Sequence, residues 1–243
     1  MNLIIDVGNS FVKLAVFENN NLIFKEIVEL DSILEEILNI KSRYKNLSNG
    51  IIASVGNLDN TQLDFIKDLF NLFILNANTK LPFINLYKTP NTLGIDRIAL
   101  ICASVNKYPN RNTLVIDAGT CITYDFVSKE NEYFGGAISP GLKMRYKSLH
   151  NFTQNLPLLS LEYPKSVIGN STAECIHSGV VNGVLNEIKG IISTYEEKYL
   201  DLTVILTGGD SNFLSKQLKS SIFANSNFLL EGLNFILQFN SNE

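Results

Sequence analysis

The chain has 243 residues, of which 45% are hydrophobic and 18% charged, a composition typical of a globular rather than a disordered protein. No stretch approaches the about 20 apolar residues needed to cross a bilayer, and the net charge of −4 comes without a basic cluster. We therefore expect neither membrane insertion nor nucleic-acid binding. A strand-like run at residues 3–6 stands where a signal peptide would lie, which predicts a cytoplasmic protein.

The first half of the chain alternates between short strands and helices. Residues 3–6 form an apolar strand that ends in a glycine-containing turn, and a second apolar strand follows the turn. Hydrophobic periodicity then predicts a strand at 21–29, a helix at 33–40, a strand at 50–55, a helix at 61–70 and a strand at 72–75. Strands at the start followed by strand–helix alternation indicate an α/β lobe with a mixed sheet.

The second half begins like the first. Residues 3–17 and 114–128 align without a gap at an offset of 111, and each pairs a strand ending in Asp with a small residue and Gly. The offset is nearly half the chain, so we predict a duplicated fold with one lobe at 1–110 and another at 111–243. Further elements predicted in this half are a strand at 132–139, helices at 142–149 and 172–195, a strand at 203–207, and helices at 212–218 and 226–239.

The helix predicted at 172–195 has the clearest periodicity. Its apolar residues recur every three or four positions, and Ser171 with Glu174 predicts a capping box at its start. Gly179 and Gly183 lie one turn apart, which permits close approach of another backbone. Packing on the sheet is the simpler interpretation, and a contact between subunits is the alternative.

Three glycine-containing turns at strand ends are candidates for binding phosphate. They lie at residues 6–10, 117–120 and 207–210. Glycine lets backbone N–H groups approach an oxyanion, and an Asp at the strand end can hold a cation that neutralises phosphate charge. Lys13 could bring positive charge, and Ser10 and Thr120 add hydroxyl groups. Each turn alone could be an ordinary hairpin, and neither a GxxxxGK[ST] nor a GxGxxG loop is present.

Residues 87–97 contain a candidate acceptor site. Asp96 and Arg97 are adjacent at the start of a predicted helix. Asp can accept a proton from an attacking hydroxyl, and Arg can bind a carboxylate or phosphate through two hydrogen bonds. The structural alternative is an Asp that favours the helix dipole, with Arg as a surface partner.

Cysteine chemistry is a weaker candidate. Cys102, Cys121 and Cys175 form no CxxC pair, and only His150 and His177 could join them, so a zinc site or disulfide framework is not expected. A Cys–His nucleophile is formally open, but buried cysteines are the simpler interpretation.

The three turns resemble the phosphate and adenosine turns of the actin, sugar-kinase and heat-shock ATPase superfamily. That resemblance implies two ribonuclease-H-like lobes with a nucleotide cleft between them. The order of motifs resembles one family in particular, the type III pantothenate kinases. The matching segments are DVGNS, LGIDR, DAGTCITYD, GGAISPGLKM, GNSTAECIHSGVVNG and TGGD.

The resemblance implies ATP-dependent phosphorylation of pantothenate, the first step toward coenzyme A, by a homodimer. Asp96 would be the general base, and Asp117 would bind a monovalent cation, K⁺ or NH₄⁺. Asp6 would lie near the magnesium ion of ATP. The residues implied in ATP binding are Asp6, Val7, Gly8, Asn9, Ser10, Phe11, Val12, Lys13 and Thr120. Those implied in substrate binding are Tyr87, Gly94, Ile95, Asp96, Arg97 and Thr172.

Some alternatives remain open from the residues themselves. The pantothenate carboxylate could be held by Arg97 or by the helix N-terminus at Thr172. A non-catalytic regulatory relative, or a kinase of the same fold acting on a sugar or another hydroxy acid, would share most of the pattern. A non-catalytic relative would be expected to lose charged site residues, and the retention of Asp6, Asp96 and Asp117 favours catalysis.

Overall fold

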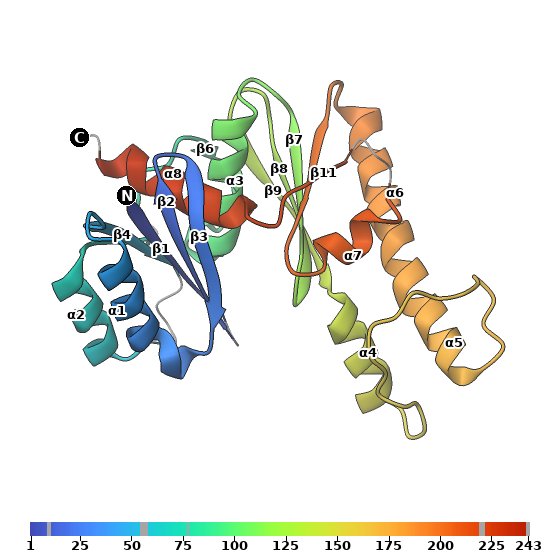
Figure 1. The fold of residues 1–243 in the computed structure, drawn as a ribbon. Coiled ribbons are helices and arrows are strands. Elements are labelled where there is room, and N and C mark those ends of the chain that lie inside the picture. The colour runs from blue at the N-terminus through green and yellow to red at the C-terminus, as the bar shows by residue number, and fades with distance from the viewer. Residues whose placement is uncertain (9–10, 54–57, 77, 219–221, 242–243) are drawn as a thin grey trace. The chain divides into compact units, whose positions relative to one another are not determined.

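The computed structural model describes residues 1–8, 11–53, 58–76, 78–218 and 222–241 (Figure 1). It divides the chain into two compact units, one comprising Met1–Lys107 with Phe228–Glu243 and the other Tyr108–Asn227. The first division falls close to the predicted boundary at residue 110. The second differs from the prediction, because the C-terminal helix belongs to the first unit.

The first unit contains a mixed sheet with the strand order β3-β2-β1-β4-β5. Strand β1 pairs antiparallel with β2 and parallel with β4; β3 is antiparallel to β2, and β5 is parallel to β4. This arrangement follows the predicted strand–turn–strand start and the later strand–helix alternation. The strands are β1 (Asn2–Val7), β2 (Val12–Glu18), β3 (Asn21–Val28), β4 (Asn49–Ala53) and β5 (Asn71–Ile74).

Helices of the first unit lie on both faces of this sheet (Figure 1). Buried apolar side chains of α1 (Ile33–Arg43) and α2 (Asn60–Leu69) join those of β1 and β2 in one core cluster. Helix α3 (Ile95–Lys107) packs against α8 (Phe228–Ser241), which also contacts β1 and β4. The remaining elements are β6 (Ile84–Asn85) and 3-10 turns at Leu30–Ser32 and Pro90–Thr92.

Polar contacts explain why the C-terminal helix α8 belongs to the first unit. Asn2 Nδ2 donates to Asn234 Oδ1 at 2.8 Å, and both side chains bridge elements that are 232 residues apart. Lys107 Nζ lies 2.9 Å from Glu231 Oε2. Such pairings between distant residues leave no periodic signal in the sequence, so the lobe prediction missed them.

The second unit repeats the same opening. Strands β7 (Thr113–Ala118), β8 (Cys121–Val127) and β9 (Glu132–Pro140) form an antiparallel meander, and β10 (Thr203–Thr207) and β11 (Ile222–Ala224) run parallel to β7. Their order is β11-β10-β7-β8-β9. One sheet face packs on α4 (Leu142–Asn151), α5 (Thr172–His177) and α6 (Gly183–Lys198), with α7 (Ser211–Ser215) also in the core.

The helix predicted at 172–195 is continuous but not uniform. A π-helical turn at Ser178–Asn182 joins α5 to α6. Ser171 Oγ accepts the Glu174 N–H at 3.3 Å, whereas the Glu174 carboxylate accepts the Asn170 N–H rather than that of Ser171. Only half of the predicted capping box is therefore present, because the Glu174 carboxylate accepts the N–H of Asn170, the residue before Ser171.

Val180, Val184 and Ile188 carry the packing of this helix on the sheet. Gly179 and Gly183 face elsewhere: a Cβ atom added to either would meet no heavy atom of the described chain within 4 Å. Packing within the chain therefore does not require these two glycines.

Strand pairing corrects the alignment of the two repeats. In the first hairpin Asp6 lies opposite Lys13, whereas in the second Asp117 lies opposite Thr123. The offset of 111 that relates Asp6 to Asp117 therefore becomes 110 (123 − 13) on the second strand of the hairpin. The buried residues agree, since Val12, Leu14 and Val16 in one core correspond to Ile122, Tyr124 and Phe126 in the other. The second turn is one residue shorter than the first.

Candidate active site

The first hairpin places an ion pair beside its glycine turn. Asp6 is the last but one residue of β1 and is only 8% exposed. Lys13 Nζ, on the facing strand, donates to Asp6 Oδ2 at 2.9 Å. Gly8 N–H donates to the Phe11 carbonyl at 3.0 Å and closes the turn. The predicted positive charge of Lys13 thus lies at the end of β1, held by the carboxylate of Asp6.

The second hairpin belongs to a cluster of three turns. Gly119 N–H donates to the Cys121 carbonyl at 2.9 Å and closes the β7–β8 turn. The Asp210 N–H donates to the Ala118 carbonyl at 2.9 Å, and the Gly141 N–H donates to the Thr120 carbonyl at 3.0 Å. The turn predicted at 207–210 and the start of α4 are therefore fixed against the turn at 117–120.

Gly208 shows how closely these turns approach each other. Its φ is +92°, a conformation that L-residues with a side chain rarely adopt. A Cβ atom there would lie 2.3 Å from Asp117 Oδ1 and 2.4 Å from the Ala118 carbonyl oxygen. Glycine is required at this position, and its absent side chain makes room for the carboxylate of Asp117.

Charged groups around this cluster influence one another. Burial raises the pKa of Asp210, and the positive charge of Lys143 at the start of α4 offsets part of that increase. Asp117 is half-buried and Thr120 exposed. Sequence reasoning named the turn that contains Asp210 but gave no role to Lys143, which follows the PGL segment of the GGAISPGLKM motif.

The predicted acceptor segment forms the N-terminal turn of α3. The Ile98 N–H donates to the Gly94 carbonyl at 3.1 Å, and the Arg97 N–H donates to Asp96 Oδ1 at 2.8 Å. The exposed Asp96 carboxylate thus folds back over the helix start, so a Cβ atom on Gly94 would lie 2.3 Å from Asp96 Oδ1. A side chain at position 94 would therefore force the Asp96 carboxylate out of this position.

Two further predicted substrate residues meet beside this turn. The Arg97 guanidinium lies over the Tyr87 ring, with its central carbon 5.5 Å from the ring centroid. Arg97 is 6% exposed although it is charged, and Ile95 is half-buried. The aromatic face favours the buried cation electrostatically. The structure therefore brings Tyr87 and Arg97 together, from segments that were ten residues apart.

The remaining predicted residues are divided between the units. Asp117, Thr120 and Thr172 belong to the second unit, and the others to the first. Thr172 is exposed at the first residue of α5. Asn9 and Ser10 lie outside the described residues, whereas their neighbours Val7, Phe11 and Val12 are described, with Phe11 54% exposed.

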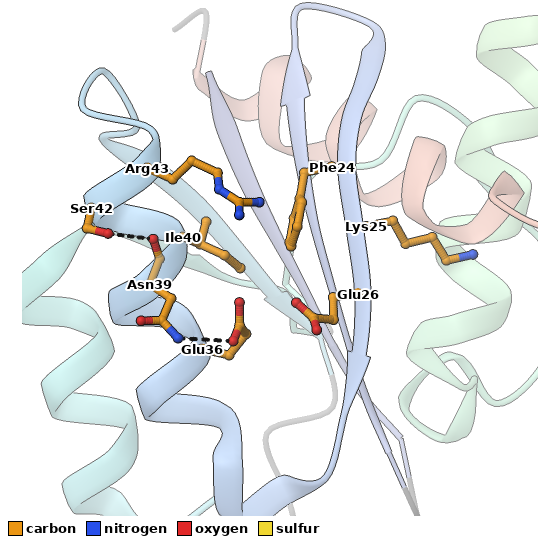
Figure 2. A pocket seen from close by; sticks show the side chains of 8 residues that line it. All are labelled: Phe24, Lys25, Glu26, Glu36, Asn39, Ile40, Ser42 and Arg43. Carbon is orange, nitrogen blue, oxygen red and sulfur yellow. Dashed lines mark hydrogen bonds between the residues drawn. The ribbon is translucent and has the colours of Figure 1, made fainter.

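A separate polar pocket, of about 640 Å³, lies between β3 and α1 (Figure 2). Phe24 and Glu26 point toward α1, whereas Lys25 points to the opposite side of the strand. Burial, and then the nearby Glu36 carboxylate, raise the pKa of Glu26. Burial and the charge of Lys13 lower the pKa of Lys25, in agreement with its place on the same sheet face as Lys13. None of the predicted site residues lines this pocket.

Cys102 is poorly placed to act as a nucleophile, and each histidine has a local partner. Cys102 is buried in α3, and burial raises the pKa of its thiol, which disfavours the thiolate. His177 Nδ1 lies 2.8 Å from the Tyr146 hydroxyl, and His150 Nδ1 lies 2.8 Å from the Leu156 carbonyl. Both histidines thus hold local structure.

Two further findings concern the described part of the chain. No group of three or more His, Cys, Asp or Glu side chains there could hold a metal ion. A metal ion bound by the described residues would therefore also need oxygen ligands from hydroxyl groups, the backbone or bound phosphates. Within the same residues, no helix is both long and apolar enough to cross a membrane.

The fold resembles those of solved structures. It is similar to an activator of 2-hydroxyisocaproyl-CoA dehydratase from Clostridium difficile solved with bound ADPNP (TM-score 0.55, 11% identity, covering 98% of this chain and 93% of that one). A ROK hexokinase from Thermus thermophilus is also similar (TM-score 0.50, 10% identity, 100% and 99% covered). The predicted fold class is confirmed: the chain is α/β with two mixed sheets.

The family follows from sequence comparison. The type III pantothenate kinase family model matches residues 2–194. A type III pantothenate kinase of Christiangramia forsetii is 52% identical over 243 residues, with 100% of both chains covered. One from Flavobacterium johnsoniae is 48% identical over 240 residues, with 98% of each covered. The chain belongs to the type III pantothenate kinase family.

Proposed function

We propose that this protein transfers the γ-phosphoryl group of ATP to the primary hydroxyl of pantothenate, giving 4′-phosphopantothenate in the first step of coenzyme A biosynthesis. The full-length similarity to type III pantothenate kinases is the observation that carries this proposal. The acceptor oxygen forms a bond to the γ-phosphorus, the bond from phosphorus to the β–γ bridging oxygen breaks, and ADP leaves. We place this reaction in the cytoplasm.

Asp96 is the general base of the proposed reaction. Its carboxylate is exposed at the start of α3, and one of its oxygens, Oδ1, is fixed by the Arg97 N–H. That hydrogen bond orients the second oxygen, Oδ2, which we assign as the acceptor of the hydroxyl proton. A carboxylate that is already held in the geometry for accepting the hydroxyl proton lowers the activation barrier, because it does not have to reorient during the reaction.

Tyr87, Gly94, Ile95 and Arg97 complete the acceptor-binding segment. The contact between the Arg97 guanidinium and the Tyr87 ring supports their joint action on one ligand. Arginine binds carboxylates through two parallel hydrogen bonds, so Arg97 is one proposed anchor of the pantothenate carboxylate. Thr172, at the first residue of α5, is the other.

The first hairpin is the proposed magnesium–ATP side. Residues 6–13 would follow the phosphates, with Lys13 supplying a positive charge and Asp6 facing the hydrated magnesium ion. The 2.9 Å contact between Lys13 and Asp6 fits this role, because the carboxylate fixes the direction of the ammonium. When bound, the magnesium ion neutralises charge on the phosphate oxygens.

The second hairpin is the proposed monovalent-cation side. Asp117 would bind K⁺ or NH₄⁺, and Thr120 would contact ATP through its exposed hydroxyl. The close approach of Gly208 to Asp117 Oδ1 fits a cation site, because it fixes the carboxylate beside backbone carbonyl oxygens. When bound, the cation offsets negative charge next to the nucleotide.

We also propose a homodimer. The open Gly179–Gly183 face of the long helix is the candidate contact, since no described atom of the same chain requires glycine there. Two glycines one turn apart allow a second helix to approach closely.

A substrate panel tests the proposed activity. ADP release would be measured with magnesium and potassium present, and with pantothenate, glucose or glycerate as acceptor. We expect ADP release with pantothenate and a phosphorylated product of matching mass. Phosphorylation of glucose but not pantothenate would show that the acceptor assignment is wrong, and no phosphorylation of any acceptor with intact ATP binding would indicate a non-catalytic relative.

A further inference from the structure

Thr123 is a buried polar residue to which neither the sequence motifs nor the proposed reaction gives a role. It is the third residue of β8 and is 9% exposed. Its Oγ1 atom is buried and has no hydrogen-bond partner in the part of the chain that the structure describes. Buried hydroxyl groups are nearly always satisfied, because leaving one without a partner costs its full desolvation energy. The hydroxyl therefore points to a ligand.

The position of Thr123 indicates which ligand. It lies directly opposite Asp117 in the antiparallel β7–β8 pair, so the two side chains lie on the same sheet face. Directly opposed residues have Cβ atoms about 4.5–5.5 Å apart, close enough for both side chains to bind one ion. Asp117 is the residue proposed to hold the monovalent cation.

The first hairpin shows what such a position can hold. Lys13 is the structural counterpart of Thr123, because it lies opposite Asp6 as Thr123 lies opposite Asp117. In the first hairpin the ammonium of Lys13 contacts the carboxylate at 2.9 Å. In the second, the chain supplies a short hydroxyl in place of an ammonium. The first hairpin thus carries a positively charged side chain opposite its Asp, and the second hairpin carries none there.

Asp125 shares the same sheet face two residues further along β8, and one of its two carboxylate oxygens accepts a hydrogen bond from a neighbouring strand. The Tyr133 hydroxyl donates to Asp125 Oδ1 at 2.7 Å. Asp125 is thus bound into the sheet structure, and the unsatisfied oxygen nearest the turn is that of Thr123.

We propose that the Thr123 hydroxyl is a second oxygen ligand of the monovalent cation at Asp117, and that this cation stands where the Lys13 ammonium stands in the first hairpin. The inference rests on the proposed cation role of Asp117. A hydroxyl oxygen has two lone pairs and binds a weakly hydrated alkali ion as a carbonyl oxygen does. It adds an oxygen ligand without a second negative charge.

The test uses Thr123→Val, which keeps the shape of the side chain and removes the hydroxyl, and Thr123→Ser, which keeps the hydroxyl. Two quantities would be measured for the full-length protein as choline chloride is replaced by KCl at constant ionic strength. One is the potassium concentration that gives half-maximal pantothenate phosphorylation. The other is the rise in Tm that potassium causes in the presence of an unreactive ATP analogue, which reports binding without turnover.

In the wild-type protein we expect saturable activation and a rise in Tm. Thr123→Val should raise the half-maximal potassium concentration at least tenfold and lose most of the Tm rise, and Thr123→Ser should stay close to wild type. Thr123→Ala, which removes the hydroxyl from a smaller side chain, should match the valine variant if that variant folds poorly.

Two results would overturn the assignment while leaving the kinase proposal intact. One is a valine variant that responds to potassium as wild type does, and the other is a raised KM for ATP with an unchanged potassium response, which would make Thr123 a nucleotide contact. A wild-type protein that phosphorylates pantothenate equally well without potassium would remove the cation site itself.

Discussion

The two hairpins that open the two units have the same pattern and different chemistry. In both, Asp is the last but one residue of the first strand, and the Gly that follows the strand closes the turn with a hydrogen bond from its N–H. Opposite the Asp, however, the first hairpin has the ammonium of Lys13 and the second the hydroxyl of Thr123. In two hairpins of similar backbone, the Asp6 carboxylate therefore faces a lysine ammonium, whereas the Asp117 carboxylate does not. The two hairpins share a strand pairing, and single side chains set the proposed role of each one.

The largest effect is expected within the unit of the first hairpin, at Asp96. Asp96→Asn keeps the shape and the Arg97 N–H contact but removes the proton acceptor, so kcat should fall by roughly 10²–10⁴-fold. Steady-state kinetics with pantothenate and ATP would measure this. Tm should change little because the side chain is exposed. Turnover at the wild-type rate would contradict the assignment of Asp96 as the base.

Removing the built-in ammonium tests the first hairpin directly. Lys13→Met deletes a charge-assisted contact and leaves Asp6 without its partner at 2.9 Å. We expect kcat/KM for ATP to fall by roughly tenfold to a hundredfold, from a contact of about 1.5–3 kcal/mol.

Lys25→Met is the matched control, since Lys25 lies on the same sheet face but opposite Ala15. It should leave kcat/KM for ATP within about threefold of wild type. In Lys13→Met the pKa of Lys25, measured by NMR, should rise, because the charge of Lys13 contributes to lowering it. An equal loss of kcat/KM for ATP in both lysine variants would argue that any positive charge on this sheet face suffices. The pairing of Lys13 with Asp6 would then have no special role.

The second unit contains an ion pair of another kind. Glu187 on α6 accepts from Arg145 on α4 at 2.5 Å and from the Tyr124 hydroxyl at 2.7 Å. Burial alone would raise the pKa of Glu187, but the hydrogen bonds from Arg145, Tyr124 and Ser139 and the charge of Arg145 together lower it. A carboxylate with a lowered pKa stabilises the fold above its ordinary pKa, and that stabilisation is lost as the pH falls through the lowered value.

Glu187→Gln should therefore reduce the free energy of unfolding at pH 7 by about 1–3 kcal/mol, with a smaller difference below the ordinary pKa near 4.5. Urea unfolding at several pH values would measure this. Asp64→Asn, in the exposed pair with Lys67, is the control and should cost less than about 0.5 kcal/mol. A pH-independent loss in Glu187→Gln would show that the packing of α4 on α6 matters more than charge.

The smallest effect on a single chain is expected on the open face of the long helix. Gly183→Leu adds a side chain where a Cβ atom would meet nothing within 4 Å, so the isolated chain should fold. If this face forms the proposed dimer, sedimentation velocity should show a shift toward monomer. Glu35→Leu on α1 adds an apolar side chain at an exposed position of a different helix and should leave the assembly unchanged. A Gly183→Leu protein with wild-type assembly would place the dimer contact elsewhere.

Much of the fold was predictable because it rests on local patterns. The alternation of Val12, Leu14 and Val16, and the three- to four-residue spacing along the long helix, describe faces that must be buried. Strands β6 and β11 were missed because two or three residues carry no period. The assignment of α8 to the first unit depends on contacts such as Asn2 with Asn234, which no local pattern encodes.

The candidate site was predictable through its motifs, and less so through its geometry. Glycine at positions 94 and 208 marks close approach of the Asp96 and Asp117 carboxylates, which the LGIDR and TGGD motifs contain but do not explain. Thr123 was missed because an ungapped alignment of the two repeats matches Lys13 with Tyr124 and not with Thr123. Matching the buried positions of the two second strands would have revealed the one-residue shift and with it the counterpart of Lys13.

The most direct test of the comparison between the hairpins is one time course. Formation of 4′-phosphopantothenate by the wild-type protein would be followed by mass spectrometry, at saturating magnesium–ATP, with either KCl or choline chloride at the same ionic strength. The account predicts product in potassium and a large loss of rate in choline, because only one of the two carboxylates has its cation built into the chain. Equal rates in both salts, or no phosphorylated pantothenate in either, would contradict it.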